Sequence, residues 1–122
     1  FVGPRRLRLA GTELEAERIF LVTGTRTAIP PIDGLGRVAY LTSRTLLYLR
    51  ELPEHLVVVG GGYVGCEFAQ MFRRFGARVT IVNRDDRLIP REDPDVSAEV
   101  EKILVEDGIE VVNRSYAGGP LD

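Results

Sequence analysis

The sequence of 122 residues is short of the residue types on which several kinds of site depend. It contains one cysteine (Cys66), one histidine (His55), one lysine (Lys102) and no tryptophan. A single cysteine cannot form a disulfide within the chain, and one cysteine with one histidine is too few for a zinc site. No apolar run approaches the ~20 residues that a membrane helix needs. The composition therefore excludes a disulfide framework, a zinc site within one chain and a membrane-spanning helix.

An excess of charge of one sign is also lacking. The chain has 16 basic and 18 acidic residues, for a formal net charge of -2. Because the two signs are interleaved along the chain, the sequence does not indicate a nucleic-acid surface. The hydrophobic share of 44% and the charged share of 28% are ordinary for a globular protein. Without disulfides or a visible signal peptide, we expect a reducing, cytoplasmic location.

Residues 56–84 form the stretch around which the rest is organised. The apolar, β-branched run 56–59 ends in three glycines, which is typical of a strand in a parallel sheet. Residues 63–75 have helical periodicity, Gly76 predicts the C-terminal cap, and residues 78–82 form the next strand. The apolar stripe that we expect this helix to bury consists of Val64, Phe68, Met71, Phe72 and Phe75.

A second helix and a third strand follow. Asp93 predicts an N-cap and Pro94 the first turn, and the helix is expected to end at Gly108. Residues 109–112 have the composition of a further parallel strand. The order β-α-β-α-β predicts an α/β fold with a Rossmann-like, doubly wound parallel sheet. The face that the second helix is expected to bury carries Val96, Val100, Ile103 and Leu104.

The residues before the central stretch are less regular. Residues 5–9 and 13–17 flank a turn and predict a two-stranded antiparallel ribbon. Residues 25–36 hold several prolines and glycines, so we expect a connection between two packed units. Thr42 or Ser43 is the predicted N-cap of a short helix with the sequence SRTLLYLREL.

The N-terminal segment also contains an apolar run, RIFLVT at residues 18–23, that has the composition of a buried strand. Such a strand needs cover, and we hypothesise that residues 1–24 complete the sheet, with RIFLVT pairing beside LVVVG at residues 56–60. The same place could be filled from a second chain, which would give a homodimer by strand exchange.

The glycine turn carries the chemistry that the sequence predicts. Gly60, Gly62 and Gly65 fit the pattern G-x-G-x-x-G between a strand and a helix. In a dinucleotide site the first glycine permits the tight turn, the second lets the pyrophosphate approach the backbone, and the third lets helix and strand pack closely. The N-terminus of the helix would offer N–H groups and partial positive charge to the phosphates. The alternative is a turn that serves backbone geometry alone.

The end of the second strand predicts the type of dinucleotide. A binder of NAD usually has a carboxylate there for the ribose hydroxyls, whereas this chain has Asn83 and Arg84. An arginine can pair with a 2′-phosphate, so we expect NADP rather than NAD. Arg87 and Arg91 could add to this charge from the following loop. The alternative is that these are solvated loop arginines among acidic neighbours.

Together these residues resemble a known family. The stretch VVVGGGYVGCEFAQMFRRFGARVTIVNRDDRLIPRED is similar to the nucleotide-binding segment of the flavoprotein disulfide reductases, especially the mercuric reductase-like and dihydrolipoamide dehydrogenase-like members. The resemblance extends from about Leu7 to Val112. It implies the end of an FAD domain and a linker at 1–36, a connecting helix at 37–55, a NAD(P)-binding Rossmann half at 56–115 and a tail at 116–122.

The resemblance also implies roles for single residues. Tyr63 matches the aromatic residue that covers the flavin in NADPH-linked members, and Glu67 matches a glutamate that pairs with a lysine of the FAD domain. Thr23 and Gly24 match a turn near the flavin nucleotide. Gly65 departs from the alanine frequent in NADPH-linked members, which favours NAD. The candidate cofactor-binding residues are Gly60, Gly62, Tyr63, Val64, Gly65, Glu67, Asn83, Arg84, Arg91, Thr23 and Gly24, with no catalytic or metal-binding candidate.

The function that the resemblance implies is that of an FAD-dependent NAD(P)H oxidoreductase, of which this chain would be the nucleotide-binding fragment, cut from a longer protein. A first glycine motif for FAD, a redox cysteine pair and a histidine–carboxylate dyad do not occur in these residues, so we expect no turnover from the fragment alone. Its partners would be the dinucleotide and the remaining FAD and interface domains. The alternatives are a non-catalytic dinucleotide-binding or self-associating module, and a remnant that binds nothing.

Overall fold

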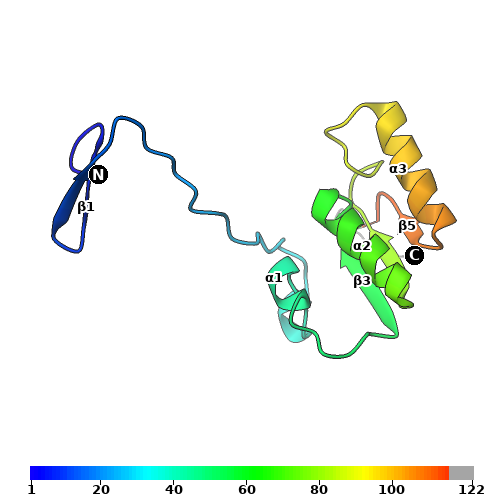
Figure 1. Cartoon of the computed structure of the whole chain (residues 1–122). Coiled ribbons are helices and arrows are strands. Elements are labelled where there is room, and N and C mark those ends of the chain that lie inside the picture. Colours follow the sequence, from blue (N-terminus) through cyan, green and yellow to red (C-terminus); the bar gives the residue numbers. More distant parts are fainter. Residues whose placement is uncertain (116–122) are drawn as a thin grey trace.

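The computed structural model describes residues 1–115, so the predicted tail lies outside the described residues. A small N-terminal ribbon stands at the end of an extended arm, well separated from a packed α/β unit (Figure 1). Within residues 1–115, no helix is long and apolar enough to cross a bilayer. In chain order the elements are β1 (Arg6–Leu9), β2 (Thr12–Glu15), a 3-10 helix (Leu35–Arg37), α1 (Ser43–Leu46), β3 (His55–Val59), α2 (Tyr63–Phe75), β4 (Arg78–Val82), α3 (Pro94–Glu106) and β5 (Glu110–Val112).

The packed unit is a three-stranded parallel sheet in the order β3-β4-β5. Its register pairs Val58 with Ile81 and Ile81 with Val111. Helix α2 packs on β3 and β4, and α3 packs on β5. The β-α-β-α-β order and the parallel sheet confirm the predicted Rossmann-like α/β fold.

Helices α2 and α3 cover the same face of the sheet. Side chains alternate between the two faces of a strand, so Leu56 and Val58 share a face with Val79 and Ile81. All four belong to the core or pack against it. Val57, which points the other way from β3, is half exposed. The core therefore lies between the helices and one side of the sheet.

Helix α2 buries only part of the predicted stripe: Phe72 is in the core, and Phe68 and Met71 pack against it. Its buried residues are Cys66, Ala69 and Phe72, whereas Val64 and Phe75 are more than half exposed. Small side chains at Cys66 and Ala69 allow the helix to lie close to the sheet, so the buried face includes them and excludes the two ends of the predicted stripe. The predicted boundaries are correct, because Gly76 adopts φ 108° and caps the helix.

Helix α3 also keeps part of its predicted face, since Leu104 is in the core and Val100 packs against it. Asp93 is the N-cap and Pro94 the first residue, as expected, but Val96 and Ile103 are exposed. The buried residues are Ser97 and Leu104. The Ser97 hydroxyl donates a hydrogen bond to the carbonyl oxygen of Leu88, which holds this side of the helix against the preceding loop.

The short helix α1 begins where the sequence indicates. Thr42 is the N-cap, and its side chain and that of Thr45 form a reciprocal capping box. The helix ends at Leu46, which is its buried residue, and is shorter than SRTLLYLREL suggests. Leu47 and Leu49 are exposed, so no packing supports further turns.

The predicted ribbon is present. Strands β1 and β2 pair in antiparallel register, with Arg8 opposite Glu13 and Arg6 opposite Glu15. Ion pairs join both of these cross-strand partners. Exposed ion pairs of this kind each contribute little, so the ribbon has no core of its own.

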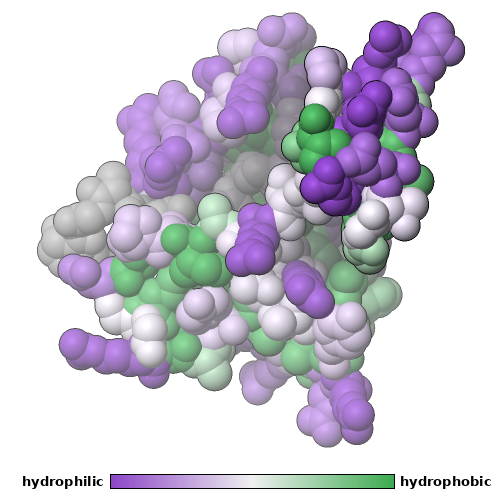
Figure 2. All heavy atoms as spheres, turned by 90° about the vertical axis from the view of Figure 1, so that its left-hand side faces the viewer, coloured by the Kyte–Doolittle hydropathy of each residue, from purple (hydrophilic) through white to green (hydrophobic). Residues whose placement is uncertain are grey.

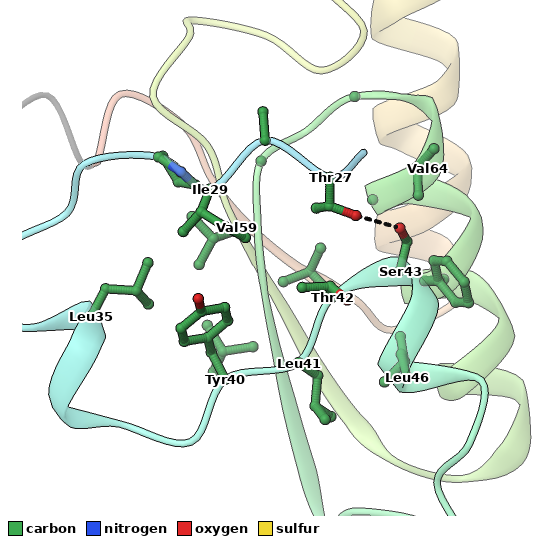
Figure 3. A pocket seen from close by; sticks show the side chains of 18 of the residues that line it. Thr27, Ile29, Leu35, Tyr40, Leu41, Thr42, Ser43, Leu46, Val59 and Val64 are labelled. Atoms are coloured by element: carbon green, nitrogen blue, oxygen red, sulfur yellow. Dashed lines mark hydrogen bonds between the residues drawn. The ribbon is translucent and has the colours of Figure 1, made fainter. Parts of the chain in front are cut away.

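The apolar run at 18–23 does not form the predicted strand. Its Phe20, Leu21 and Val22 are 70–90% exposed, and β3 remains an edge strand. The hypothesis that residues 1–24 complete the sheet within the chain is therefore wrong. Residues 27–43 lie beside β3 instead, where Ile29 meets Val59 (Figure 3), and the arm leads away from the sheet (Figure 1).

Candidate functional site

The glycine turn joins β3 to α2. Gly60 adopts φ 109°, a conformation that favours glycine, and its N–H donates to the carbonyl of Val82 at 2.9 Å. Gly62 is the N-cap of α2 and has no side chain with which to cap it. The N–H groups of the first helical turn have no partner within the helix, and this turn begins at Gly62 and Tyr63, which line a cavity.

Two glycines in this turn are required by close packing. A Cβ on Gly65 would lie 2.3 Å from the carbonyl oxygen of Gly60 and 3.3 Å from Val58 Cγ1. Gly65 therefore stands in place of alanine for a steric reason, because α2 approaches β3 too closely here for a methyl group. A Cβ on Gly61 would lie 2.5 Å from Leu88 Cδ2. At Gly62, by contrast, an added Cβ would meet nothing within 4 Å, which leaves room for a ligand.

Asn83, at the end of β4, is directed inward. The residue is only 3% exposed, and its Oδ1 accepts the Gly61 N–H at 3.2 Å. Its Nδ2 donates to the carbonyls of Arg87 and Asp85 and to Oδ1 of Asn113. Its side chain is therefore engaged with the protein.

A cavity of about 360 Å³ opens at the turn. Arg84 and Arg91 are exposed at its side, and Arg84 Nε lies 3.5 Å from Asp85 Oδ1. An exposed ion pair of this kind is weak enough for a stronger anionic partner to replace it. The lining residues are Gly60, Gly61, Gly62, Tyr63, Asn83, Arg84, Asp85, Ile89, Pro90 and Arg91.

Tyr63 connects the start of α2 to the loop before α3. Its hydroxyl donates a hydrogen bond to Oε1 of Glu92. That bond, followed by desolvation and the negative charge of Glu92, raises the pKa of the Tyr63 phenol above its usual value. Tyr63 is half exposed, so the contact lies at the open side of the cavity.

The structure brings some of the predicted site residues together and separates others. Gly60, Gly62, Tyr63, Asn83, Arg84 and Arg91 line the cavity at the turn. Val64 and Gly65 line a second cavity, and Glu67 lies exposed on α2. Thr23 and Gly24 are exposed in the N-terminal arm.

The second cavity, of about 590 Å³, lies between the linker and the edge of β3. Ile29 and Tyr40 of the linker face Val59 across it (Figure 3). Thr27 and Ser43 hydrogen-bond at 3.5 Å at its margin. Its lining is dominated by apolar side chains and contains no charged group that could bind a phosphate. Such a lining fits contact with another apolar surface.

Sequence reasoning missed the importance of Gly61 and Leu88. Gly61 occupies a variable position of the glycine pattern, yet its carbonyl accepts the Ile89 N–H at 2.7 Å. Leu88 is fully buried against the turn. The only available signal was the run of three glycines, which is one more than the pattern requires at that place.

Cys66 is a core residue. Its thiol is buried, contacts the Gly61 carbonyl at 3.7 Å, and has a pKa raised by burial, so it stays protonated. Within residues 1–115, no group of three or more histidine, cysteine or acidic side chains is arranged to hold a metal ion.

Comparisons with known proteins agree with this geometry. The sequence model of the family described as pyridine nucleotide-disulphide oxidoreductase matches residues 3–117. Mercuric reductase of Streptomyces lividans is 50% identical over 102 residues, which are 84% of this chain and 21% of that protein. Dihydrolipoyl dehydrogenase of Bacillus subtilis is 38% identical over 122 residues, covering 97% of this chain and 27% of that protein.

A solved structure shares the fold. The HOCl-induced flavoprotein disulfide reductase RclA of Escherichia coli is 40% identical, with a TM-score of 0.73, over 95% of this chain and 27% of that one. The chain thus spans about a quarter of the length of these relatives. Since the family model matches nearly all of its residues, the chain belongs to the pyridine nucleotide-disulphide oxidoreductase family.

Proposed function

We propose that this chain is the nucleotide-binding part of an FAD-dependent oxidoreductase and that it binds NADPH in preference to NADH. The observation that carries the proposal is the cavity at the glycine turn, where the N-terminus of α2 and two exposed arginines border the same space. A helix N-terminus attracts phosphate through its free N–H groups and its dipole. The open space at Gly62 would admit a pyrophosphate against the backbone.

The residues present fit a 2′-phosphate better than a free ribose hydroxyl. The residue that directly follows β4 is Asn83 rather than a carboxylate, and it is occupied with internal hydrogen bonds. Arg84 follows it with an exposed guanidinium, and Arg91 lines the same cavity. Arginine pairs well with phosphate, and the weak contact to Asp85 would be exchanged for it. When bound, the reduced nucleotide would supply hydride to the flavin of the full-length protein.

The test is a comparison of cofactor affinities by calorimetry. Arg84→Gln should weaken NADPH binding about tenfold to a hundredfold, because a hydrogen bond to a charged group contributes about 1.5–3 kcal/mol. NADH, which has no 2′-phosphate, should bind unchanged. Arg78→Gln, an exposed arginine at the opposite end of β4, serves as the control. Tighter binding of NADH than NADPH by the unaltered chain would contradict the NADP assignment.

The exposed apolar surface supports a larger parent enzyme. In residues 1–115, the unpaired edge of β3, the apolar cavity beside it and the half-exposed Val57 and Val59 are surfaces that further domains would cover. Figure 2 shows hydrophobic side chains exposed between hydrophilic ones on the face turned toward the N-terminal arm. Mercuric reductase and dihydrolipoyl dehydrogenase, to which the chain is similar, are oxidoreductases by name. The purified chain should show no flavin absorbance and no turnover; a yellow protein would contradict its role as a nucleotide-binding part alone.

A self-associating module is the second candidate, and one observation favours it. Residues 19–22 have the composition of a strand and are mostly exposed, and within residues 1–115 β3 has an unpaired edge. A second copy could therefore donate its arm to β3, which would give a strand-exchanged homodimer. Light scattering after size-exclusion chromatography should then show a dimer that Leu21→Asp converts to a monomer. A monomer at all concentrations would eliminate this candidate.

A further inference from the structure

We infer that Asn83 is a positioning residue, which joins the glycine turn to the loop 85–91 and so sets the two walls of the nucleotide cavity. The inference rests on the proposed function for its ligand and extends it. The strand-end residue is usually expected to contact the ribose itself. Here its side chain serves the backbone around the ligand, and discrimination of the 2′-phosphate falls to the exposed arginines.

The hydrogen bonds of Asn83 leave its side chain little capacity to bind a ligand. Oδ1 accepts from the Gly61 N–H at 3.2 Å, and Nδ2 lies 2.9 Å from the Arg87 carbonyl, 3.1 Å from Asn113 Oδ1 and 3.3 Å from the Asp85 carbonyl. An amide nitrogen has two hydrogens, so both are in use. With the residue 3% exposed, the side chain is committed to the protein.

The peptide of Gly61 is held from both sides. Asn83 accepts its N–H, while its carbonyl accepts the Ile89 N–H at 2.7 Å. Leu88 closes the remaining space, since even a Cβ on Gly61 would overlap it. Asn83 and the loop therefore determine where the turn, and with it the N-terminus of α2, stands in relation to the arginines.

A carboxylate at this position would break the arrangement. In Asn83→Asp the second oxygen would face three oxygen acceptors, those of Arg87, Asp85 and Asn113, in place of the donor that they now share. The carboxylate would keep only the Gly61 N–H as a donor. A buried charge with so few partners is costly, so the loop would move away from the turn. If residue 83 contacted the ribose, Asn83→Asp would be expected to favour NADH. In this structure it should instead weaken the binding of both NADPH and NADH.

The first experiment needs no cofactor. Amide hydrogen exchange is followed by NMR on the 122-residue chain, and the Gly61 N–H, which Asn83 accepts, should exchange at least tenfold more slowly than the Gly62 N–H. Asn83→Ala should abolish that protection, whereas the control Asn113→Ala, which removes one acceptor of Nδ2 and keeps the bond to Gly61, should retain it. Equal exchange at Gly61 and Gly62 in the unaltered chain would overturn the inference even if the variants failed to fold.

The second experiment measures the dissociation constants of NADPH and NADH for Asn83→Asp, well below the midpoint of its unfolding transition. At such a temperature the variant is folded, so a lower global stability does not by itself change its affinity for either cofactor. We expect both affinities to fall about tenfold, with their ratio unchanged. Tighter NADH binding would show that residue 83 reads the ribose and would overturn the inference. If the unaltered chain bound neither cofactor, the proposed function would fail, while the exchange of Gly61 would still decide the role of Asn83.

Discussion

At the scale of single residues, the site depends on where backbone atoms come close together. Gly65 lies where α2 crosses the carbonyl of Gly60, and Gly61 lies under Leu88. The role of Gly65 in close packing could be predicted from the glycine pattern, which is local in sequence. That of Gly61 could not, because Leu88 and Asn83 reach it from more than 20 residues away.

Gly65→Ala should lower the free energy of unfolding by about 1–3 kcal/mol, because the added methyl group overlaps the Gly60 carbonyl and the turn must shift. Urea denaturation measures the change. Gly36→Ala is the matched control: an added Cβ there meets nothing within 4 Å, so stability should change by no more than about 0.5 kcal/mol. Equal effects of the two substitutions would contradict the close approach of α2 to β3 at Gly65.

The contact between Tyr63 and Glu92 predicts a titration shift. Glu92→Gln should lower the pKa of the Tyr63 phenol, because it removes the carboxylate that accepts the hydrogen bond of the phenol and repels the phenolate. Ultraviolet titration, with Tyr63→Phe subtracted to isolate this phenol, measures it. Because the Tyr63 pKa is raised in the folded state, the contact stabilises the folded state fully at pH values below the unfolded pKa of about 10. This stabilisation is lost as the pH rises through the folded-state pKa. Glu99→Gln, on the exposed side of α3, should leave the titration unchanged.

At the scale of elements, the ends of α2 and the start of each helix were predictable, whereas the helix faces were predicted only in part. The ends depend on residues next to them in sequence, such as the Thr42 cap and Gly76. The rotation of α2 and α3 depends on partners elsewhere, since Ser97 hydrogen-bonds to Leu88 and the small residues of α2 meet the sheet. An apolar stripe broad enough to include five large side chains does not by itself determine which of them turns inward.

Two phenylalanines of α2 test this rotation. Phe72 is 6% exposed and Phe75 is 62% exposed, although both belong to the predicted stripe. Phe72→Ala should lower the free energy of unfolding by about 3–5 kcal/mol, the usual cost of emptying a core aromatic site. Phe75→Ala should cost about 1 kcal/mol or less, since it loses chiefly its edge contact with Phe72. Thermal or urea unfolding of both variants decides between the predicted and the observed face.

At the scale of the whole molecule, the chain is a packed unit with an extended arm (Figure 1). Limited digestion with trypsin should cut first after Arg18 and Arg26, because exposed irregular backbone fits a protease active site. Arg78, in the central strand β4, should resist cleavage. Mass spectrometry of the early fragments checks the order, and early cleavage after Arg78 would contradict the fold. Protection of the arm at high protein concentration would instead favour strand exchange.

By itself the sequence determined the β-α-β-α-β order of the packed unit, the N-terminal ribbon, the glycine turn and the family, because caps, periodicity and turn residues act over a few neighbouring positions. Only the tertiary structure decided which helix faces are buried, that Asn83 turns inward, and that residues 18–23 stay outside the sheet. Each of these depends on what lies opposite a residue in space. An apolar strand pairs only where an edge is within reach, and in this fold the linker, rather than the strand, lies beside β3.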